Sequence, residues 1–160
     1  GHVGKDLVRL LKPFNCKILA YDIQDFKEFY AENNVTPVGL DDLMKKSDVV
    51  TLHLPLDDST KNIMNQERLQ MLKSNAVLIN LARGGLIDEA ILKEMLIGNK
   101  IAGAALDVFE IEPLIDPTFA AMDNVLITPH IGGSTEEAIL AMGMTAINGL
   151  DNAKDPLNFL

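Results

Sequence analysis

Short runs of apolar, largely β-branched residues recur along the chain and predict β-strands. The runs cover residues 17–21, 49–54, 76–80, 101–106 and 125–128. Within each run the residues are mostly apolar instead of alternating with polar ones. This pattern is typical of parallel strands that are buried on both faces of a sheet, and we expect such strands here.

Helical spacing of apolar residues appears between these runs. Val3, Leu7 and Leu11 recur every four residues and predict a helix near the start of the chain. A second helix is predicted around residues 91–96 and ends at Gly98, a residue type suited to a helix C-terminus. Residues 57–75 are expected to form a loop and then a helix around 66–72, and the proline-punctuated residues 113–124 a loop.

The last predicted helix begins near Ser134. Ser134 and Glu137 have the spacing of a capping box, in which the two side chains satisfy the first backbone N–H groups of a helix. The apolar positions that follow predict an inward-facing stripe made of Ile139, Met142, Ala146 and Leu150.

Strands that alternate with helices indicate an α/β protein with a doubly wound parallel sheet. We find no internal repeat, low-complexity tract or linker in the 160 residues, so we expect a single domain over residues 1–160. Doubly wound sheets bind ligands beyond the carboxyl ends of their strands. The residues that directly follow each predicted strand are therefore the candidates for a functional site.

Composition excludes several classes of protein. The 14 Lys and Arg against 23 Asp and Glu give a net charge of −9, which disfavours a nucleic-acid partner. One cysteine, Cys16, excludes a disulfide framework, and no His or Cys spacing indicates a metal. No apolar window is long enough for a membrane span. Hydrophobic residues make up 48% of the chain, as expected for a globular protein without a membrane partner.

The start of the chain carries a candidate dinucleotide site. Gly1-His2-Val3-Gly4 opens the first predicted helix, where glycines would let the backbone approach a pyrophosphate. Asp22 follows the first predicted strand, 18 residues after Gly4, at the place of the acid that binds ribose hydroxyls. Each feature alone also fits an ordinary helix start or turn. No Arg or Lys follows within residues 23–25, which favours NAD over NADP.

Later strand ends carry a cation, carboxylates and an imidazole. Arg83 follows the strand at 76–80, Asp107 and Glu112 follow the strand at 101–106, and His130 follows the strand at 125–128. Taken singly, each could be a solvated loop residue or a structural histidine. Together they match the needs of hydride exchange on a hydroxy acid, namely a cation for the carboxylate, a base for the hydroxyl proton and an acid that orients the base.

The chain resembles the NAD-binding domain of the D-isomer-specific 2-hydroxyacid dehydrogenases along nearly its whole length. The matching segments are Gly1-His2-Val3-Gly4, Tyr21-Asp22, His53-Leu54-Pro55-Leu56, residues 80–88, residues 103–109, Glu112-Pro113 and residues 129–135. The resemblance implies a Rossmann-type sheet that lacks its first strand here, since the glycine motif starts at residue 1. We accordingly expect an N-terminally truncated fragment without a substrate domain, and no turnover from the fragment alone.

The resemblance also implies residue roles. Arg83 would bind the substrate carboxylate and carbonyl oxygen, His130 would be the general acid and base, and Glu112 would pair with it and favour its protonated form. Glu110 is an alternative for this role, and the family spacing favours Glu112. The implied cofactor-binding residues are Gly1, His2, Val3, Gly4, Asp22, Leu54, Leu81, Ala82, Arg83, Asp107, His130, Gly132 and Gly133.

The family resemblance narrows the function further. Glu112 argues against the formate dehydrogenase branch, which has an amide there, and residues 132–138 are most similar to the phosphoglycerate dehydrogenase branch. We expect an NAD-dependent oxidoreductase for a small 2-hydroxy or 2-keto acid, cytoplasmic and homodimeric. The alternative is a binding module similar to the family's transcriptional corepressors, which dimerise when they bind NAD and retain the same catalytic residues.

Overall fold

A computed structural model of the chain describes residues 1–113 and 116–151. These residues fall into two compact units that divide between Pro129 and His130, and each is described by itself. The first unit contains the strands and most helices, and the second contains one long helix, α7 (Glu136–Asp151).

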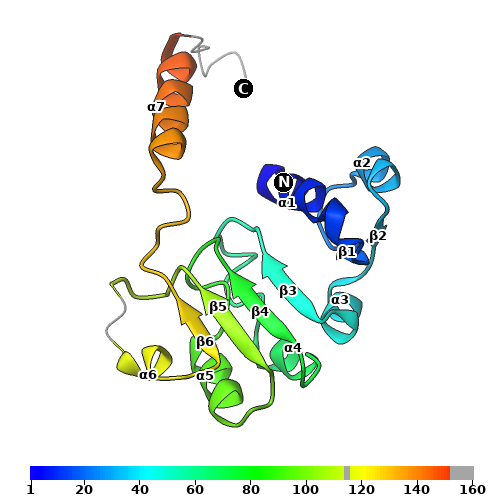
Figure 1. Ribbon diagram of the computed structural model, residues 1–160, viewed down its shortest axis with the longest axis vertical. Coiled ribbons are helices and arrows are strands. Elements are labelled where there is room, and N and C mark those ends of the chain that lie inside the picture. Colours follow the sequence, from blue (N-terminus) through cyan, green and yellow to red (C-terminus); the bar gives the residue numbers. More distant parts are fainter. Residues whose placement is uncertain (114–115, 152–160) are drawn as a thin grey trace. The chain divides into compact units, whose positions relative to one another are not determined.

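The strands of the first unit form two parallel sheets (Figure 1). The larger has the order β3–β4–β5–β6, made of Val49–Leu52, Val77–Asn80, Gly103–Leu106 and Val125–Ile127. The smaller pairs β1 (Ile18–Ala20) with β2 (Val35–Pro37). Among the described residues, no strand pairing joins β1 to β3, so the hydrogen-bonded sheet is interrupted there.

Helices alternate with these strands along the chain. In sequence order they are α1 (His2–Leu11), the short 3₁₀ helix η1 (Lys12–Phe14), α2 (Lys27–Glu32), α3 (Leu40–Lys46), α4 (Gln66–Gln70), α5 (Glu89–Ile97) and α6 (Pro117–Ala120). Asn65, Asp88 and Asp116 cap α4, α5 and α6, because each side chain accepts a hydrogen bond from a backbone N–H of the first turn. The predicted α/β fold is confirmed.

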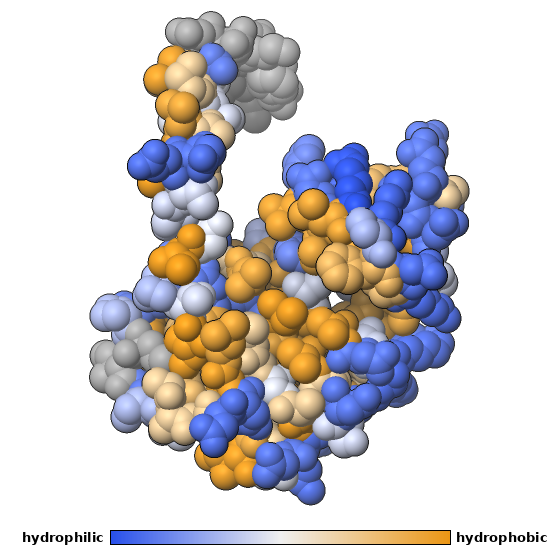
Figure 2. All heavy atoms as spheres, viewed as in Figure 1, coloured by the Kyte–Doolittle hydropathy of each residue, from blue (hydrophilic) through white to orange (hydrophobic). Residues whose placement is uncertain are grey.

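The core lies against one face of the four-stranded sheet. Val50 and Leu78 from the strands pack there with Leu92 and Leu96 of α5. The opposite face is open in part: Leu126 is 66% exposed, and Figure 2 shows apolar side chains gathered over the larger sheet. Val49 and Leu126 are 56% and 66% exposed, so the prediction of strands buried on both faces does not hold at these positions.

The predicted strands and the four predicted helices are confirmed, with ends that differ by a few residues. The sequence patterns missed β2, α2 and α3. The predicted loop at residues 113–124 is wrong in part, because Asp116 caps the short helix α6; residues 114–115 of that prediction lie outside the described residues.

The start of α7 also differs from the prediction. The cap is Thr135, whose hydroxyl accepts from the backbone N–H of Ala138, so the helix begins one residue later than a Ser134 cap requires. Ile139 is 58% and Leu150 77% exposed within the second unit taken by itself, so the inward-facing stripe stays a prediction. No helix within the described ranges has the length and apolar character that crossing a membrane requires.

Candidate active site

Arg83 stands on a turn that a buried asparagine holds in shape. Asn80, the last residue of β4, is only 2% exposed. Its side-chain nitrogen donates to the carbonyl oxygen of Arg83 at 2.9 Å, and its side-chain oxygen accepts from the N–H of Ala82 at 3.1 Å. The guanidinium of Arg83 is exposed and donates to the carbonyl oxygen of Ala82 at 2.7 Å. The backbone of the turn is thus fixed, and the cation is presented to solvent.

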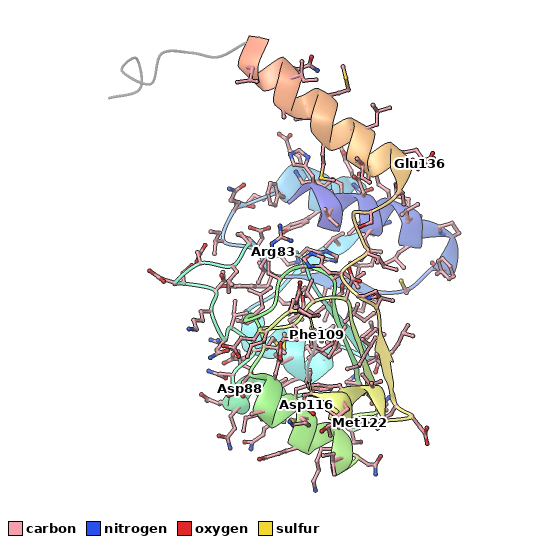
Figure 3. The ribbon with its side chains drawn as sticks, turned by 90° about the vertical axis from the view of Figure 1, so that its left-hand side faces the viewer. Arg83, Asp88, Phe109, Asp116, Met122 and Glu136 are labelled. Carbon is pink, nitrogen blue, oxygen red and sulfur yellow. The ribbon has the colours of Figure 1, made fainter. Side chains whose placement is uncertain are left out.

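Gly84 brings this turn against the loop that follows β5. A Cβ atom on Gly84 would lie 1.9 Å from the carbonyl oxygen of Phe109 and 2.6 Å from the nitrogen of Glu110. Only glycine permits this approach, since any side chain would collide with backbone. The turn that carries Arg83 and the loop that leads to Glu112 are therefore in direct backbone contact; Figure 3 labels Arg83 and Phe109 in these two segments.

The loop that carries Glu112 is folded back on itself. One carboxylate oxygen of Glu112 accepts from the backbone N–H of Phe109 at 2.9 Å. The Phe109 ring is buried and packs on Phe119 of α6, with ring centroids 5.9 Å apart. The N–H of Glu110 donates to the Glu89 carboxylate at 2.6 Å. Glu110 and Glu112, the two alternatives for the acid role, are both exposed residues. They differ in that the Glu112 carboxylate accepts from the backbone of its own loop, whereas Glu110 is held through its backbone N–H.

Asp107 links the ends of three adjacent strands. Its backbone N–H donates to the carbonyl oxygen of Asn80 at 3.0 Å, and its carboxylate accepts from the hydroxyl of Thr128. Asp107 is 2% exposed, so this acid is held within the structure and is not a freely solvated loop residue. The ends of β4, β5 and β6 are joined by these contacts into one edge.

The nucleotide end of the first unit contains a small hollow beside Asp22. The carboxylate of Asp22 accepts from the N–H of Gln24 at 2.9 Å, and its other oxygen lies 3.4 Å from the nitrogen of Gly1. The hollow has a volume of about 180 Å³, and it is lined by Ala20, Asp22, Ile23, Gln24, Asp25, Tyr30, Pro37 and Val38. A carboxylate beside apolar walls suits the adenosine of NAD, because the acid accepts hydrogen bonds from ribose hydroxyls and the walls accept a base. The residues present therefore fit this cofactor.

Gly4 and His53 lie next to each other at this end. A Cβ atom on Gly4 would be 3.9 Å from the ring of His53, an ordinary contact distance. The Nε2 atom of His53 lies 3.1 Å from the hydroxyl of Thr51, and burial lowers the pKa of His53 below its usual range. Burial thus favours the neutral form of this histidine, which lies beside the start of α1.

The remaining predicted cofactor residues differ in how far they are exposed. His2 is exposed, and Val3 and Leu81 are 66% and 53% exposed. Leu54 and Ala82 pack at the edge of the core. His130 has a left-handed backbone, φ 55°, at the start of the second unit, where Gly132 and Gly133 follow it in an exposed segment. Since His130 belongs to the second unit, its pairing with Glu112 stays a prediction.

The sequence patterns do not identify the residues that hold the loops of the candidate site in place. Asn80 and Gly84 lie in a segment that matches the family but have no predicted role, and Thr128 and Glu89 have no predicted role in the site. A polar residue at the end of an apolar run, such as Asn80, can indicate a buried side chain that forms hydrogen bonds to the backbone of the following turn. The partners of Thr128 and Glu89 are 21 residues away, so no local pattern indicates them. In the part of the chain that the structure describes, no three His, Cys, Asp or Glu side chains are grouped to hold a metal ion.

A parallel α/β sheet with an acid after its first strand and charged residues beyond its carboxyl edge defines a dinucleotide-binding domain. Comparison with known families identifies which one. Residues 1–132 match the family model described as D-isomer specific 2-hydroxyacid dehydrogenase, NAD binding domain. The chain belongs to this family, and its cofactor is NAD.

Individual relatives agree with this assignment. The chain is 44% identical over 144 residues to D-3-phosphoglycerate dehydrogenase of Methanocaldococcus jannaschii, covering 89% of this chain and 28% of that protein. It is 39% identical over 150 residues to hydroxypyruvate reductase of Thermotoga maritima, covering 92% of this chain and 48% of that protein. The chain thus spans less than half the length of these relatives.

A solved structure gives the same result for the fold. The NAD-complexed form of a D-isomer specific 2-hydroxyacid dehydrogenase from Lactobacillus delbrueckii ssp. bulgaricus superposes with a TM-score of 0.84 at 33% identity. The match covers 98% of this chain and 52% of that one.

Proposed function

We propose that this chain is the NAD-binding part of an enzyme that exchanges a hydride between NAD and a small D-2-hydroxy acid or 2-keto acid. One observation supports this most strongly. The turn of Arg83 and the loop of Glu112 are in backbone contact at Gly84, so a cation and a carboxylate are held on one edge of the sheet. The proposed reaction needs a cation that binds the acid and a carboxylate that stabilises the protonated histidine, both near the reacting centre.

The proposed roles follow from the chemistry of each side chain. NAD supplies the hydride acceptor when it is bound. Arg83 binds the substrate carboxylate through a planar guanidinium, whose two parallel N–H groups match the two carboxylate oxygens. His130 takes the hydroxyl proton as the hydride leaves C2, and in reduction it returns that proton to the oxygen. Glu112 stabilises the imidazolium that forms.

We assign cofactor contacts on the same basis. Asp22 binds the ribose hydroxyls of the adenosine, and the backbone of residues 1–4 approaches the pyrophosphate. Asp107, held by Thr128, lies toward the nicotinamide end. The other proposed contacts are Leu54, Leu81, Ala82, Arg83, His130, Gly132 and Gly133.

The chain is proposed to be part of a longer protein. It spans 28% and 48% of two relatives, and β1 and β3 are unpaired with each other, which fits a sheet completed by a further strand between them. A substrate domain would also come from elsewhere in that protein. Such domains exclude water from the reacting centre, so we expect residues 1–160 alone to show no turnover.

D-3-phosphoglycerate is the proposed preferred substrate. Support comes from the 44% identity to a D-3-phosphoglycerate dehydrogenase, against 39% to a hydroxypyruvate reductase and 41% to a glyoxylate reductase of Pyrococcus horikoshii. We further propose a cytoplasmic homodimer, on the family resemblance. Light scattering on the purified whole enzyme tests the dimer.

The experiment uses the whole enzyme with D-3-phosphoglycerate, hydroxypyruvate and glyoxylate, each with the matching form of NAD. Activity with at least one of them supports the reaction class, and the highest kcat/KM identifies the branch. Arg83→Ala should lower kcat/KM for the acid by about 10²-fold, with Arg83→Lys restoring it only in part. Arg9→Ala, which removes an exposed arginine paired with Asp6, is the control and should change nothing. No turnover of any of the three acids would contradict the proposal.

A further inference from the structure

The peptide bond between Phe109 and Glu110 is held on both of its edges by the segment that follows the Arg83 turn. Its carbonyl side lies against Gly84, where no side chain fits. Its N–H side donates to the carboxylate of Glu89 at 2.6 Å. Gly84 and Glu89 are five residues apart in sequence, so one short segment holds this peptide unit from both sides.

The carboxylate of Glu89 can accept from the loop because another residue, Asp88, caps the helix α5. Asp88 accepts from the N–H of Ile91 and satisfies the start of α5. An acid in the first turn usually only complements the helix dipole from the surface. Here the Glu89 side chain is partly buried, and it reaches a loop 21 residues away.

The charges around Glu89 show that its placement is unfavourable for the carboxylate itself. Burial raises the pKa of Glu89, and the negative charges of Glu110 and Glu112 raise it further; the N–H of Glu110 and the positive charge of Lys93 oppose them. Lys93, one turn along α5, pairs with Asp116 at 2.5 Å. The hydrogen bond from the Glu110 N–H favours the charged form, so the partly buried carboxylate of Glu89 is held by its contact with the loop.

We infer that Glu89 is a positioning residue for the reaction, which holds the loop of residues 109–112 so that Glu112 stands in register with Arg83; this inference rests on the proposed function. Glu112 closes the same loop from its other end by accepting from the N–H of Phe109 at 2.9 Å. The position of the Glu112 carboxylate therefore depends on where the peptide at 109–110 is held. Glu89 acts through that peptide, with no role in the reaction chemistry itself.

Two conservative variants distinguish the effect of the length of the Glu89 side chain from the effect of its negative charge. Glu89→Asp keeps the negative charge at the helix start but shortens the side chain by about 1.5 Å, which takes the acceptor beyond hydrogen-bonding distance. Glu89→Gln removes the charge but keeps an oxygen that can accept from the Glu110 N–H. In the whole enzyme we expect Glu89→Asp to lower kcat by about 10-fold to 10²-fold with little change in KM for NAD. Glu89→Gln should remain within about threefold of the parent, a smaller loss than misplacement causes.

A second measurement tests the hydrogen bond between Glu89 and the Glu110 N–H independently of enzyme activity. Hydrogen exchange at the backbone amide of Glu110 should be faster in Glu89→Asp than in the parent, and close to the parent in Glu89→Gln. Glu67→Asp and Glu67→Gln, at an exposed acid in the first turn of α4, are the matched controls and should change neither kcat nor this amide.

The outcomes decide between explanations. A loss of kcat in Glu89→Gln with Glu89→Asp unaffected would assign a charge role to Glu89 and overturn the inference. Equal losses in both, or none in either, would also overturn it. If the parent turns over none of the tested acids while the Glu110 amide responds as expected, the proposed function has failed and the contact alone stands. If the parent is active but the amide does not respond, only the inference has failed.

Discussion

The side-chain amide of Asn80 donates to the carbonyl oxygen of Arg83, 2.9 Å away, from a position that is 2% exposed. An exposed charge of the candidate site is thus supported by one of the most buried polar groups in the first unit. Because the contact is made to the backbone of Arg83, it holds the turn without using the guanidinium, which donates to the carbonyl oxygen of Ala82. On the proposed function, stability and substrate binding would therefore depend on the same hydrogen bond.

Replacement of Asn80 should impair both properties. Asn80→Ala leaves the carbonyl of Arg83 and the N–H of Ala82 without their side-chain partner, and we expect a loss of about 2 kcal/mol in the free energy of unfolding. kcat/KM for the acid should fall by about tenfold through misplacement of Arg83. Denaturant titration and steady-state kinetics measure the two effects. Asn75→Ala, at an exposed asparagine before β4, should leave both unchanged.

Substitution of Gly84 tests the backbone contact between the two functional segments. Gly84→Ala places a Cβ atom 1.9 Å from the carbonyl oxygen of Phe109, so the segments must move apart. We expect a destabilisation of about 3 kcal/mol or more, as found where a residue is forced against backbone. Gly143→Ala is the control: no atom lies within 4 Å of its Cβ position in α7, and alanine favours a helix. A Gly84→Ala protein as stable as the parent would contradict the contact.

Asp22 should determine which nicotinamide cofactor is preferred. Its carboxylate would repel the 2′-phosphate of NADP, and like charges in contact cost several kcal/mol. We expect kcat/KM for NAD to exceed that for NADP by about 10²-fold or more, and Asp22→Asn to reduce the ratio by at least about tenfold. Asp123→Asn, at an exposed acid, controls for a general change in charge. A parent enzyme that prefers NADP would remove Asp22 from the site.

The pH dependence of catalysis should identify the acid that serves His130. His130→Ala should lower kcat by roughly 10²–10⁴-fold, the usual contribution of a general acid and base. Glu112→Gln removes a negative charge that favours imidazolium, so the limb of the kcat/KM profile that reports the histidine should move to lower pH, by about one unit. Glu110→Gln should leave the profile in place. A shift in Glu110→Gln with none in Glu112→Gln would transfer the role to Glu110.

His53 should make the fold sensitive to mild acid. Burial lowers the pKa of His53 in the folded state, so the unfolded chain binds more protons as the pH falls. Its contribution to stability is complete above the unfolded value of about 6.5 and is lost as the pH falls toward the lower folded value. Denaturation at about pH 7.5 and about pH 5 should show a smaller fall in stability for His53→Gln than for the parent. His2→Gln, at an exposed histidine, should match the parent.

Sequence patterns predicted the strands of the larger sheet well because an apolar run leaves a strong local signal, as at Val77–Asn80. They missed β2 because Val35–Pro37 is three residues long and contains a proline. They missed α3, although Leu40, Leu43 and Met44 have helical spacing, because Asp41 and Asp42 make the segment resemble a turn. The cap of α7 was misplaced by one residue because Ser134 and Thr135 are both suitable caps.

In the candidate site, too, some features could be predicted from the sequence and others could not. Charged residues after strands could be recognised singly, and the family spacing grouped Arg83 with Glu112. The contacts that position them could not be recognised, because they join residues such as Glu89 and Glu110 that are close only after folding. Gly84 needs its neighbour from another loop before its role is visible.

The interruption of the sheet between β1 and β3 has a consequence for cooperativity. Asp22 follows the small sheet and Arg83 follows the large one, and among the described residues no strand pairing ties these sheets together. In residues 1–160 by themselves, each sheet can then open locally at its own free energy. A ligand that contacts both Asp22 and Arg83 would stabilise both sheets at once, by an amount that grows with its concentration. At the proposed site, a dinucleotide bound to these residues alone would thus couple the unfolding of the two sheets.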